Sequence, residues 1–345
     1  MRAVVSVHPP EEPDPAIRAF VERSGLVSGP GRARFIPLTG GVSSDIWLVE
    51  EGERRFCVKR ALAKLRVKAD WRVPVERNAY EAEWLNGAAR LAPGSAPRIL
   101  AEDPGAGMFA MEYLPGESYR SWKADLLAGR VDVSVAKAVG ERLGAIHAAF
   151  AREPDVRQRF ATDANFSAIR LEPYLVATAG AHNDLCTPLL GLAERTAATR
   201  RTVVHGDISP KNILIGPQGP VFLDAECAWF GDPAFDLAFC LNHMLLKCLV
   251  APAAVEALLE SFRVLASSYL AKVDWEDAGE VEARAATLLP GLFLARVDGK
   301  SPVEYVTAEA DKEHVRQTAR RLLLSPPALL CDVAEDWRRE IGRNP

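Results

Sequence analysis

The chain has 345 residues, 48% of them apolar, which suffices for a substantial core and favours two lobes or domains over one. Its 42 basic and 46 acidic residues leave a net charge of −4, so neither nucleic acid nor a membrane surface is expected as a partner. The N-terminal stretch holds only a short apolar run, and the six cysteines form no CxxC pair. We therefore expect no signal peptide, membrane anchor, zinc site or redox motif, and a protein of the reducing cytoplasm.

The first third of the chain predicts a small antiparallel sheet with one helix. Residues 34–60 alternate apolar and polar positions around the turn clusters TGGVSS and EEGERR, a pattern typical of three antiparallel strands. The segment PVERNAYEAEWLNGAARL is predicted to be a helix, because Tyr80, Trp84, Leu85 and Ala88 fall on one face at helical spacing. PRILAED and MFAMEYL, on either side of PGAG, predict two further strands.

Two features of this first third are suited to gripping phosphate. Gly40 and Gly41 lie in a predicted turn between strands, where the absence of side chains lets backbone N–H groups approach an anion. Lys59 emerges from a buried strand, and such a lysine needs a counter-ion, for which Glu81 and Glu83 on the following helix are both candidates. Each feature also has an ordinary interpretation, as a hairpin turn and as a solvated lysine.

From about Ser121 onward, long helical patterns such as SVAKAVGERLGAIHAAFA replace the strands. One exception is VVHGDISPKNILI, in which two short runs typical of buried strands enclose a polar loop with Asp207 and Asn212. Shortly afterwards, the apolar run of FLDAE delivers Asp224 to the end of another predicted strand. Three oxygen-bearing side chains at neighbouring strand ends suit a hard divalent cation and phosphoryl transfer, although Asp207 and Asn212 could instead cap turns.

The segment HGDISPKNIL followed by FLDAECAWFGDPAFDLA resembles the kinase-like small-molecule phosphotransferases, which include aminoglycoside phosphotransferases and choline kinases, with some similarity to methylthioribose kinases. It keeps the spacing of the protein-kinase catalytic loop, an Asp and then an Asn five residues on. The resemblance implies an α+β, bilobal, protein-kinase-like fold, with a small antiparallel-sheet N-lobe carrying one main helix and a larger, mostly helical C-lobe. We expect an N-terminal extension over residues 1–30, a nucleotide-binding N-lobe over 31–115, and a C-lobe with the catalytic loop, metal motif and acceptor site over 116–345.

The resemblance also implies roles for individual residues. Asp207 would orient the acceptor hydroxyl toward the γ-phosphate of ATP or accept its proton. Asn212 and Asp224 would hold Mg²⁺. Lys59 would hold the α- and β-phosphates, paired with Glu81, which better keeps the family spacing, or with the glutamate two residues on.

The remaining contacts to ATP are expected from the turn and from the link between the lobes. Ser43 or Ser44, together with the backbone, would cover the triphosphate, because TGGVSS lacks the GxGxxG pattern of protein kinases. Backbone groups of Glu112, Tyr113 and Leu114 in FAMEYL would hydrogen-bond adenine at the hinge. The metal motif reads DAE rather than DFG, as in many small-molecule relatives.

The acceptor site is less clearly marked. Trp229 is a candidate wall of this site, although a buried aromatic is the commoner explanation. Arg296, in LFLARVDGKSPVEY, is a candidate by loose similarity to methylthioribose kinases, although a turn with surface charges explains it equally well. His205 and Asp236 are expected to brace the polar loop without touching substrate, and His147 is expected to be a packed helix residue.

These features predict an ATP- and Mg²⁺-dependent enzyme that transfers the γ-phosphate to a hydroxyl of a small molecule, such as an aminoglycoside, an amino alcohol or a sugar. The alternative is a catalytically silent, nucleotide-binding scaffold of the same fold. Such a protein would be expected to have lost at least one of the four central polar residues, and all are present: Lys59, Asp207, Asn212 and Asp224. Composition does not choose among the acceptors, nor does it indicate an oligomeric state.

Overall fold

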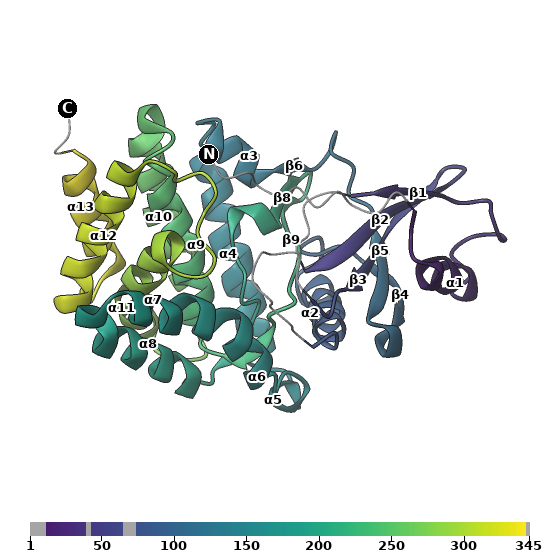
Figure 1. Ribbon diagram of the computed structural model, residues 1–345, viewed down its shortest axis with the longest axis horizontal. Coiled ribbons are helices and arrows are strands. Elements are labelled where there is room, and N and C mark those ends of the chain that lie inside the picture. Colours follow the sequence, from purple (N-terminus) through teal and green to yellow (C-terminus); the bar gives the residue numbers. More distant parts are fainter. Residues whose placement is uncertain (1–11, 39–42, 65–73, 343–345) are drawn as a thin grey trace. The chain divides into compact units, whose positions relative to one another are not determined.

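The structure is a computed structural model, and the residues that it describes are 12–38, 43–64 and 74–342 (Figure 1). The chain divides into two compact units. The first comprises Met1–Asn86 and Pro97–Pro115, and the second comprises Gly87–Ala96 and Gly116–Pro345. The first unit contains an antiparallel sheet and the second is mostly helical, so the α+β fold class expected from the sequence is confirmed.

The sheet of the first unit is antiparallel throughout and has the strand order β1-β2-β3-β5-β4. Its strands are β1 (Arg34–Pro37), β2 (Ser44–Glu51), β3 (Arg54–Ala61), β4 (Ile99–Asp103) and β5 (Met108–Glu112). The three strands predicted by alternation and the two predicted around PGAG are all present. The short turn η1 (Pro104–Ala106) joins the last two.

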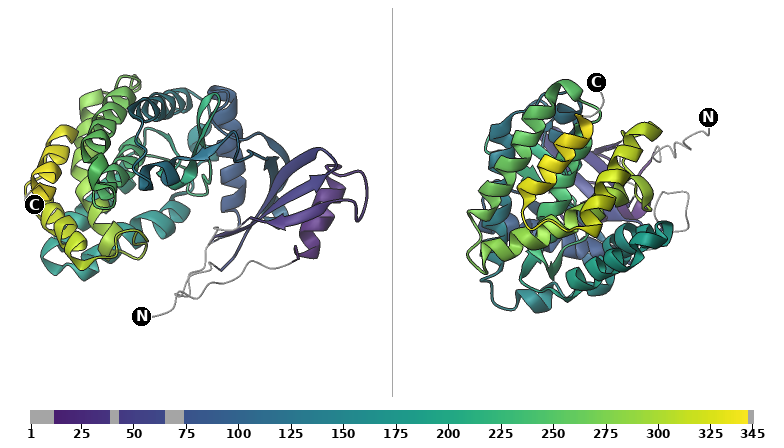
Figure 2. Two further views of the ribbon diagram at one scale, coloured as in Figure 1. Left: turned by 90° about the horizontal axis from the view of Figure 1, so that it is seen from above. Right: turned by 90° about the vertical axis from the view of Figure 1, so that its left-hand side faces the viewer.

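One face of this sheet is covered by α1 (Pro15–Arg23), as Figures 1 and 2 show. The helix begins at Asp14, whose side chain accepts a hydrogen bond from the Ala16 N–H (2.8 Å), and a proline occupies its first position. The helix and the sheet share one core, which consists of Ile17, Phe20, Val21, Val27, Trp47, Val49, Phe56, Val58, Met108 and Ala110. This helix therefore belongs to the fold of the first unit, whereas the sequence predicted only an extension here.

The predicted main helix is present as α2 (Arg77–Leu91). Trp84 and Leu85 are fully buried on the expected face. Gly87 lies against the ring of Phe150, and a Cβ atom at this glycine would lie 2.7 Å from the ring. Glycine therefore permits a close approach that any larger residue would prevent.

Helices form most of the second unit (Figure 2). The long helices α4 (Val133–Phe150) and α10 (Val255–Leu270) pack against each other, and α9 (Pro233–Lys247) packs against α10 and α11 (Ala278–Asp298). Every residue of α9 is buried. The other helical segments are α3 (Trp122–Leu127), α5 (Val156–Arg159), α6 (Asp163–Phe166), the π-helical η2 (Ser167–Val176), α7 (Ala177–Ala181), η3 (Asn183–Leu185), α8 (Cys186–Ala198), η4 (Pro210–Asn212), η5 (Pro252–Ala254), α12 (Glu309–Leu324) and α13 (Leu330–Ile341).

Two small groups of antiparallel strands lie within the second unit. The first has the order β6-β8-β9 and the second pairs β7 with β10. Their bounds are β6 (Arg120–Ser121), β7 (Thr202–Val204), β8 (Ile213–Gly216), β9 (Gly219–Phe222) and β10 (Trp229–Gly231). The polar loop thus joins β7 to β8, and the acidic residue of FLDAE follows β9, as predicted.

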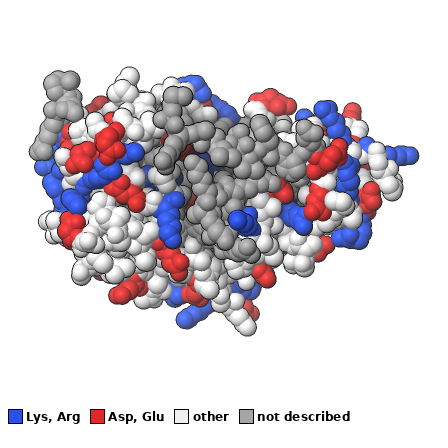
Figure 3. All heavy atoms as spheres, viewed as in Figure 1, with Lys and Arg blue, Asp and Glu red and all other residues white. Residues whose placement is uncertain are grey.

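The described helices include none that is by itself long and apolar enough to cross a membrane. Pro233–Lys247 and Pro252–Leu270, which are bent by 120° relative to each other, reach the required length and composition only when taken together. Acidic and basic side chains are interspersed over the described face that Figure 3 shows. This mixture agrees with the near balance of 42 basic and 46 acidic residues.

Replacing Phe20 by Ala is expected to lower the free energy of unfolding by about 3–5 kcal/mol, because it would leave a cavity between α1 and the sheet. Urea unfolding followed by tryptophan fluorescence measures the loss. Leu324→Ala is the control, since that side chain is 66% exposed and its removal should change stability by less than about 0.5 kcal/mol. Equal effects of the two substitutions would contradict the packing of α1.

Candidate active site

The polar loop between β7 and β8 carries the first two candidate residues. A single helical turn closes the loop, and the Asn212 N–H donates to the Ser209 carbonyl (2.9 Å). The Asn212 side chain folds back, since its Nδ2 donates to the Asp207 carbonyl at 3.0 Å. This hydrogen bond holds Asn212 and Asp207 together. It uses the amide nitrogen of the Asn212 side chain and not the amide oxygen.

Asp224 reaches the same region from the neighbouring strand. β8 and β9 pair so that Ile213 lies opposite Phe222, and the Leu223 N–H donates to the Asn212 carbonyl (2.9 Å). Asp224 comes next, with φ at +67°, in the left-handed region where residues other than glycine are uncommon and often functional. Asn212 and Asp224 therefore meet at adjoining strand ends.

A fully buried carboxylate, that of Asp236 on α9, holds the start of the polar loop. Its Oδ2 accepts from the His205 N–H (2.7 Å) and its Oδ1 from the Gly206 N–H (2.8 Å). The His147 ring on α4 lies with Nε2 3.2 Å from the same carboxylate and Nδ1 2.8 Å from the Tyr269 hydroxyl. Three polar groups thus stabilise a charge that has no contact with solvent. These contacts agree with the expected bracing role of Asp236.

His205 connects the polar loop to the end of β9. The Asp207 N–H donates to its Nδ1 (3.1 Å), and its Nε2 donates to the Leu223 carbonyl (3.0 Å). Only the neutral ring with its proton on Nε2 makes both bonds. Burial holds the pKa of His205 below its usual value in spite of the nearby charge of Asp236, so the ring stays neutral at pH 7. The residue before Asp224 is therefore fixed by the loop that carries Asp207.

The second residue of the loop has to be glycine. Gly206 has φ at +78°, and a Cβ atom there would lie 2.7 Å from Cys227 Cβ and 2.8 Å from the Cys227 carbonyl oxygen. A side chain would strain the backbone and also push the loop away from the segment that follows Asp224. Packing thus accounts for the order histidine, glycine, aspartate.

Asp207 is 3% exposed and has two cations beside one oxygen. Arg170 Nη2 lies 2.9 Å and Lys211 Nζ lies 3.0 Å from Oδ2. Burial would raise the pKa of Asp207, but the charges of Arg170 and Lys211 outweigh it and hold the pKa below its usual value. The carboxylate is therefore charged at pH 7.

Arg170 comes from the π-helical segment η2, and no motif in the sequence marks it. Its Nε donates to the Gly206 carbonyl, so it contacts both the backbone and the carboxylate of the polar loop. π-helical turns are rare and often lie at functional sites. The only sign in the sequence is a basic residue inside an apolar run, FSAIRLEPYLV, which by itself indicates no partner.

In the first unit, Lys59 and Glu81 form a buried ion pair. Lys59 Nζ lies 2.7 Å from Oε2 and 2.8 Å from Oε1, and both side chains are 2% exposed. Alternation along β3 turns Lys59 away from the face on which Val58 packs with α1. Asn78 donates to the Lys59 carbonyl (3.3 Å) and to the Gly107 carbonyl (2.7 Å), which ties the start of α2 to the sheet.

The predicted phosphate-binding turn is described only in part. Ser43 and Ser44, at the start of β2, are 8% and 2% exposed. Gly40 and Gly41 lie outside the described residues. Arg77, which no motif in the sequence marks, is buried and donates to the Ser43 carbonyl, so it fixes the strand end beside this turn.

The three residues expected to bind adenine end the first unit. The Glu112 N–H donates to the Arg98 carbonyl (2.9 Å), and Arg98 Nε lies 3.3 Å from the Glu112 carboxylate. The Arg55 guanidinium lies 5.3 Å from the centre of the Tyr113 ring. Leu114 lies one residue before the end of the unit.

A family model described as the phosphotransferase enzyme family matches residues 34–267, which is more than half of the chain. The chain belongs to this family. The resemblance found in the two motifs is therefore confirmed, and the match includes both the Lys59–Glu81 pair and the polar loop.

Two proteins similar to this chain are methylthioribose kinases. That of Pectobacterium atrosepticum is 26% identical over 260 residues, covering 65% of this chain and 64% of that kinase, less than two thirds of its length. That of Pectobacterium carotovorum subsp. carotovorum is 26% identical over 325 residues, covering 79% and 80%. Among solved structures, an amicoumacin kinase in complex with AMP-PNP and Ca²⁺ has the same fold, with a TM-score of 0.57 and 13% identity over 91% of this chain and 95% of that one.

Of the two candidate residues for an acceptor site, Trp229 is a core residue. It is 1% exposed and stacks on Phe166 with ring centres 4.2 Å apart. Its Nε1 donates to Asp163 (3.0 Å), and the Arg200 guanidinium lies 4.4 Å from its ring centre. These contacts favour the structural interpretation of Trp229.

Arg296 is buried near the end of α11 rather than exposed in a turn. Its Nη1 donates to the Tyr174 hydroxyl (3.0 Å) and to the Ser301 carbonyl. The guanidinium groups of Arg296 and Arg170 lie 5.6 and 5.7 Å from the centre of the same Tyr174 ring. Arg296 is thus linked through Tyr174 and Arg170 to Asp207.

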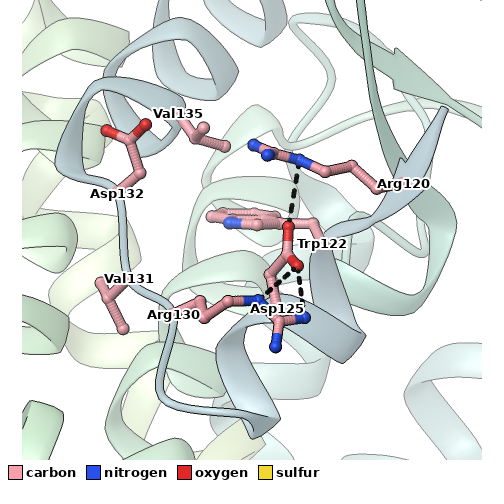
Figure 4. A pocket seen from close by; sticks show the side chains of 7 residues that line it. All are labelled: Arg120, Trp122, Asp125, Arg130, Val131, Asp132 and Val135. Atoms are coloured by element: carbon pink, nitrogen blue, oxygen red, sulfur yellow. Dashed lines mark hydrogen bonds and ion pairs between the residues drawn. The ribbon is translucent and has the colours of Figure 1, made fainter. Parts of the chain in front are cut away.

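A pocket of about 230 Å³ lies where α3 and α4 begin (Figure 4). Asp125 lies between two of its arginines, 3.2 Å from Arg120 and 2.8 Å from Arg130. The other carboxylate, that of Asp132, caps α4 by accepting from the Ser134 N–H (2.9 Å). The charges in this pocket already have partners, so we assign it no role in phosphoryl transfer.

Replacing Arg170 by Gln is expected to raise the pKa of Asp207, because the cation is removed while burial remains. The carboxylate would then become protonated at a higher pH than in the wild type. ¹³C NMR of labelled aspartate carboxylates measures this, with Asp207→Asn to assign the signal. Replacing the exposed Arg157 by Gln is the control and should leave the titration unchanged. An unaltered Asp207 pKa in the Arg170 variant would contradict the assigned cause.

Proposed function

We propose that this phosphotransferase transfers the γ-phosphate of ATP to a hydroxyl group of a small molecule. The observation that carries the proposal is the charged, buried carboxylate of Asp207, held five residues before Asn212 and beside the strand end that bears Asp224. Phosphoryl transfer requires little covalent chemistry from the protein, because positioning and electrostatic stabilisation do most of the work. A buried carboxylate and a neutral histidine brace the polar loop, so it is suited to positioning the reacting groups.

Asn212 and Asp224 would hold Mg²⁺. An amide oxygen and a carboxylate are hard donors, and Mg²⁺ commonly takes one or two protein ligands and completes an octahedral shell with water and phosphate oxygens. Within residues 12–38, 43–64 and 74–342, no group of three or more His, Cys, Asp or Glu side chains could hold a metal ion. The donor set therefore fits a cation that binds together with a nucleotide. Such an ion neutralises charge on the phosphates when bound.

Lys59 would hold the α- and β-phosphates of ATP, with Glu81 keeping its ammonium group in place. The pair is buried and its geometry is fixed by two short N···O distances, 2.7 and 2.8 Å. Ser43 or Ser44 would cover the triphosphate together with the glycine turn before them. Adenine would bind the backbone of residues 112–114.

Asp207 would orient the acceptor hydroxyl for attack on the γ-phosphorus. As the new O–P bond forms and ADP leaves, the hydroxyl proton would pass to the carboxylate. Because Arg170 and Lys211 hold the pKa of Asp207 low, it is a weak base. A loose transition state demands little base strength, so orientation is the main contribution of this residue.

The acceptor is proposed to be a small molecule, and its hydroxyl is the group that reacts. The methylthioribose kinases and the amicoumacin kinase are named for small molecules. The near balance of charge gives no reason to expect nucleic acid or a membrane surface as a partner. A cytoplasmic location is part of the proposal.

Asp207→Asn is expected to lower turnover at least about 100-fold, because the amide neither orients the hydroxyl in the same way nor accepts its proton. ADP release from ATP and Mg²⁺ with a panel of hydroxyl acceptors measures turnover, and calorimetry checks that ATP still binds. Asp184→Asn, which alters an exposed carboxylate, is the control and should be fully active. Retained turnover in the Asp207 variant would overturn its role, and ATP binding without turnover by the wild type would favour a silent scaffold.

Lys59→Met and Glu81→Leu are each expected to lower the free energy of unfolding by about 3–5 kcal/mol, because each removes one half of a buried ion pair. The double variant should regain most of this loss, since an apolar pair replaces the ion pair. ATP binding should nevertheless stay at least tenfold weaker in the double variant than in the wild type. Urea unfolding and calorimetry separate the two effects. Normal ATP affinity in the double variant would exclude Lys59 as a phosphate ligand.

A further inference from the structure

The second unit brings together an excess of buried basic side chains. Lys247 and His243 lie one turn apart on α9 and are 1% and 5% exposed, and Arg296 on α11 is 8% exposed. Tyr305, in the loop after α11, reaches both α9 residues, with its hydroxyl 2.9 Å from His243 Nδ1 and 3.4 Å from Lys247 Nζ. We refer to Lys247, His243, Arg296 and Tyr305 as the basic cluster.

The N–H donors of the basic cluster outnumber its acceptors. Lys247 has three donors, and its hydrogen-bond partner is the neutral hydroxyl of Tyr305. Lys247 donates a hydrogen bond to the Tyr305 hydroxyl, and that hydroxyl in turn donates to His243 Nδ1. A ring nitrogen that accepts carries no proton, so the proton of the neutral His243 ring lies on Nε2. His243 Nε2 and Arg296 Nε both lack a hydrogen-bond partner in the described part of the chain. Buried donors without acceptors are costly, and a ligand that supplied oxygen atoms would remove this cost.

No carboxylate of residues 12–38, 43–64 and 74–342 forms an ion pair with the basic cluster, and Glu304 acts on Lys247 only from a distance. Within the residues that the structure describes, Lys247 forms no ion pair, and Glu304, which lies next to Tyr305, is paired with Lys123. The pKa of Lys247 is lowered to about 7, mainly by burial and to a smaller extent by nearby cations such as Lys123. Burial also holds the pKa of His243 well below its usual value. An anion bound here would favour the charged form of Lys247.

A chain of contacts links the basic cluster to Asp207. Arg296 donates to the Tyr174 hydroxyl at 3.0 Å, and Arg170 lies over the same ring while it pairs with Asp207. Phe239 of α9 contacts Tyr174, with ring centres 5.4 Å apart, and also the histidine of the basic cluster at 5.8 Å. The cluster therefore adjoins the residues that surround the proposed hydroxyl-orienting carboxylate.

We propose that the basic cluster binds the anionic group, a carboxylate or a phosphate, of an acidic acceptor whose hydroxyl is presented to Asp207. The presentation to Asp207 rests on the proposed kinase function, whereas the anion site itself does not. An anion accepts charge-assisted hydrogen bonds from the unpaired donors of Lys247, Arg296 and His243. A cationic acceptor, such as an aminoglycoside or choline, would be repelled by the same groups in a setting of low dielectric constant. A packing role alone would be served better by an apolar side chain at position 247.

The anion site is tested first without any acceptor. Thermal unfolding is measured in sodium acetate, sodium phosphate and sodium chloride at equal ionic strength, for the wild type, Lys247→Met and the exposed-lysine control Lys272→Met. Acetate or phosphate should raise the Tm of the wild type and the control above the value in chloride, and should do so less in Lys247→Met. In chloride, Lys247→Met should melt at the wild-type temperature or higher, because it removes a buried amine without an acid partner. Equal anion effects in the three proteins would overturn the proposal.

The pH dependence gives a second readout. Above pH 7, anion affinity should fall by up to about tenfold per pH unit, because the anion binds more tightly when the amine of Lys247 is protonated, and binding should take up a proton. The charged and titratable groups that act on Lys247 are Cys240 and His243 on α9, Lys123 on α3, Arg296 on α11, and Glu304 and Tyr305 after it. Calorimetry in buffers of different ionisation enthalpy measures the proton uptake. Acetate or phosphate binding that is independent of pH between 6 and 9 would contradict a role for Lys247.

The acceptor class is tested by ADP release from ATP and Mg²⁺. The panel contains D-gluconate and D-ribose 5-phosphate as the carboxylate and phosphate arms, D-ribose as the neutral analogue, and kanamycin and choline as cations. Release with an anionic member that falls at least tenfold in Lys247→Met but not in Lys272→Met would support the proposal. Release with a neutral or cationic member at equal rates in both variants would overturn the acidic acceptor and leave the kinase function standing. Anion stabilisation that requires Lys247, with no ADP release from the panel, would support the anion site and count against the kinase function.

Discussion

The buried carboxylate of Asp236 is the constraint on which the rest of the site depends. A charge without solvent is stable only when donors surround it, and two of its donors are the backbone N–H groups of His205 and Gly206. The bonds that stabilise the charge therefore also fix the path of the polar loop. Through the neutral ring of His205, the same constraint reaches the strand end before Asp224. One buried charge thus sets the geometry of both segments that carry the proposed catalytic and metal-binding groups.

The contacts of Asp207 fix the orientation of its carboxylate and at the same time make it a weaker base. Arg170 and Lys211 keep its carboxylate charged and fixed, and by lowering its pKa they make it a weaker base. For a reaction whose transition state is loose and highly charged, a well-oriented weak base serves better than a mobile strong one. The arginine on the π-helical segment also ties the polar loop to the helices that contribute the basic cluster, so orientation and acceptor binding depend on the same packing.

The protein buries two lysines in contrasting ways. Lys59 has a carboxylate partner, so its charge is balanced within the protein and its position is fixed before any ligand binds. Lys247 has a neutral hydroxyl instead, and its pKa near 7 means that a ligand decides whether it is charged. Replacing an unpaired buried amine with an apolar side chain would make the protein more stable, so its presence indicates a binding role. Stability and function are expected to favour different residues at this position.

The sequence by itself determined the strands of the first unit, its main helix, and the convergence of the polar loop with FLDAE, because these depend on alternation and on spacing within short segments. It also placed Lys59 on a buried strand, but it left two glutamates as partners, and only the packing of α2 on the sheet decided for Glu81. Arg170, Lys247 and Arg296 converge from segments far apart in the chain, and no local pattern records which helix faces meet. Tertiary structure decided this part of the site, because the packing of α9, α11 and η2 sets which side chains lose contact with water. Loss of that contact is what lowers the pKa of a basic residue such as Lys247.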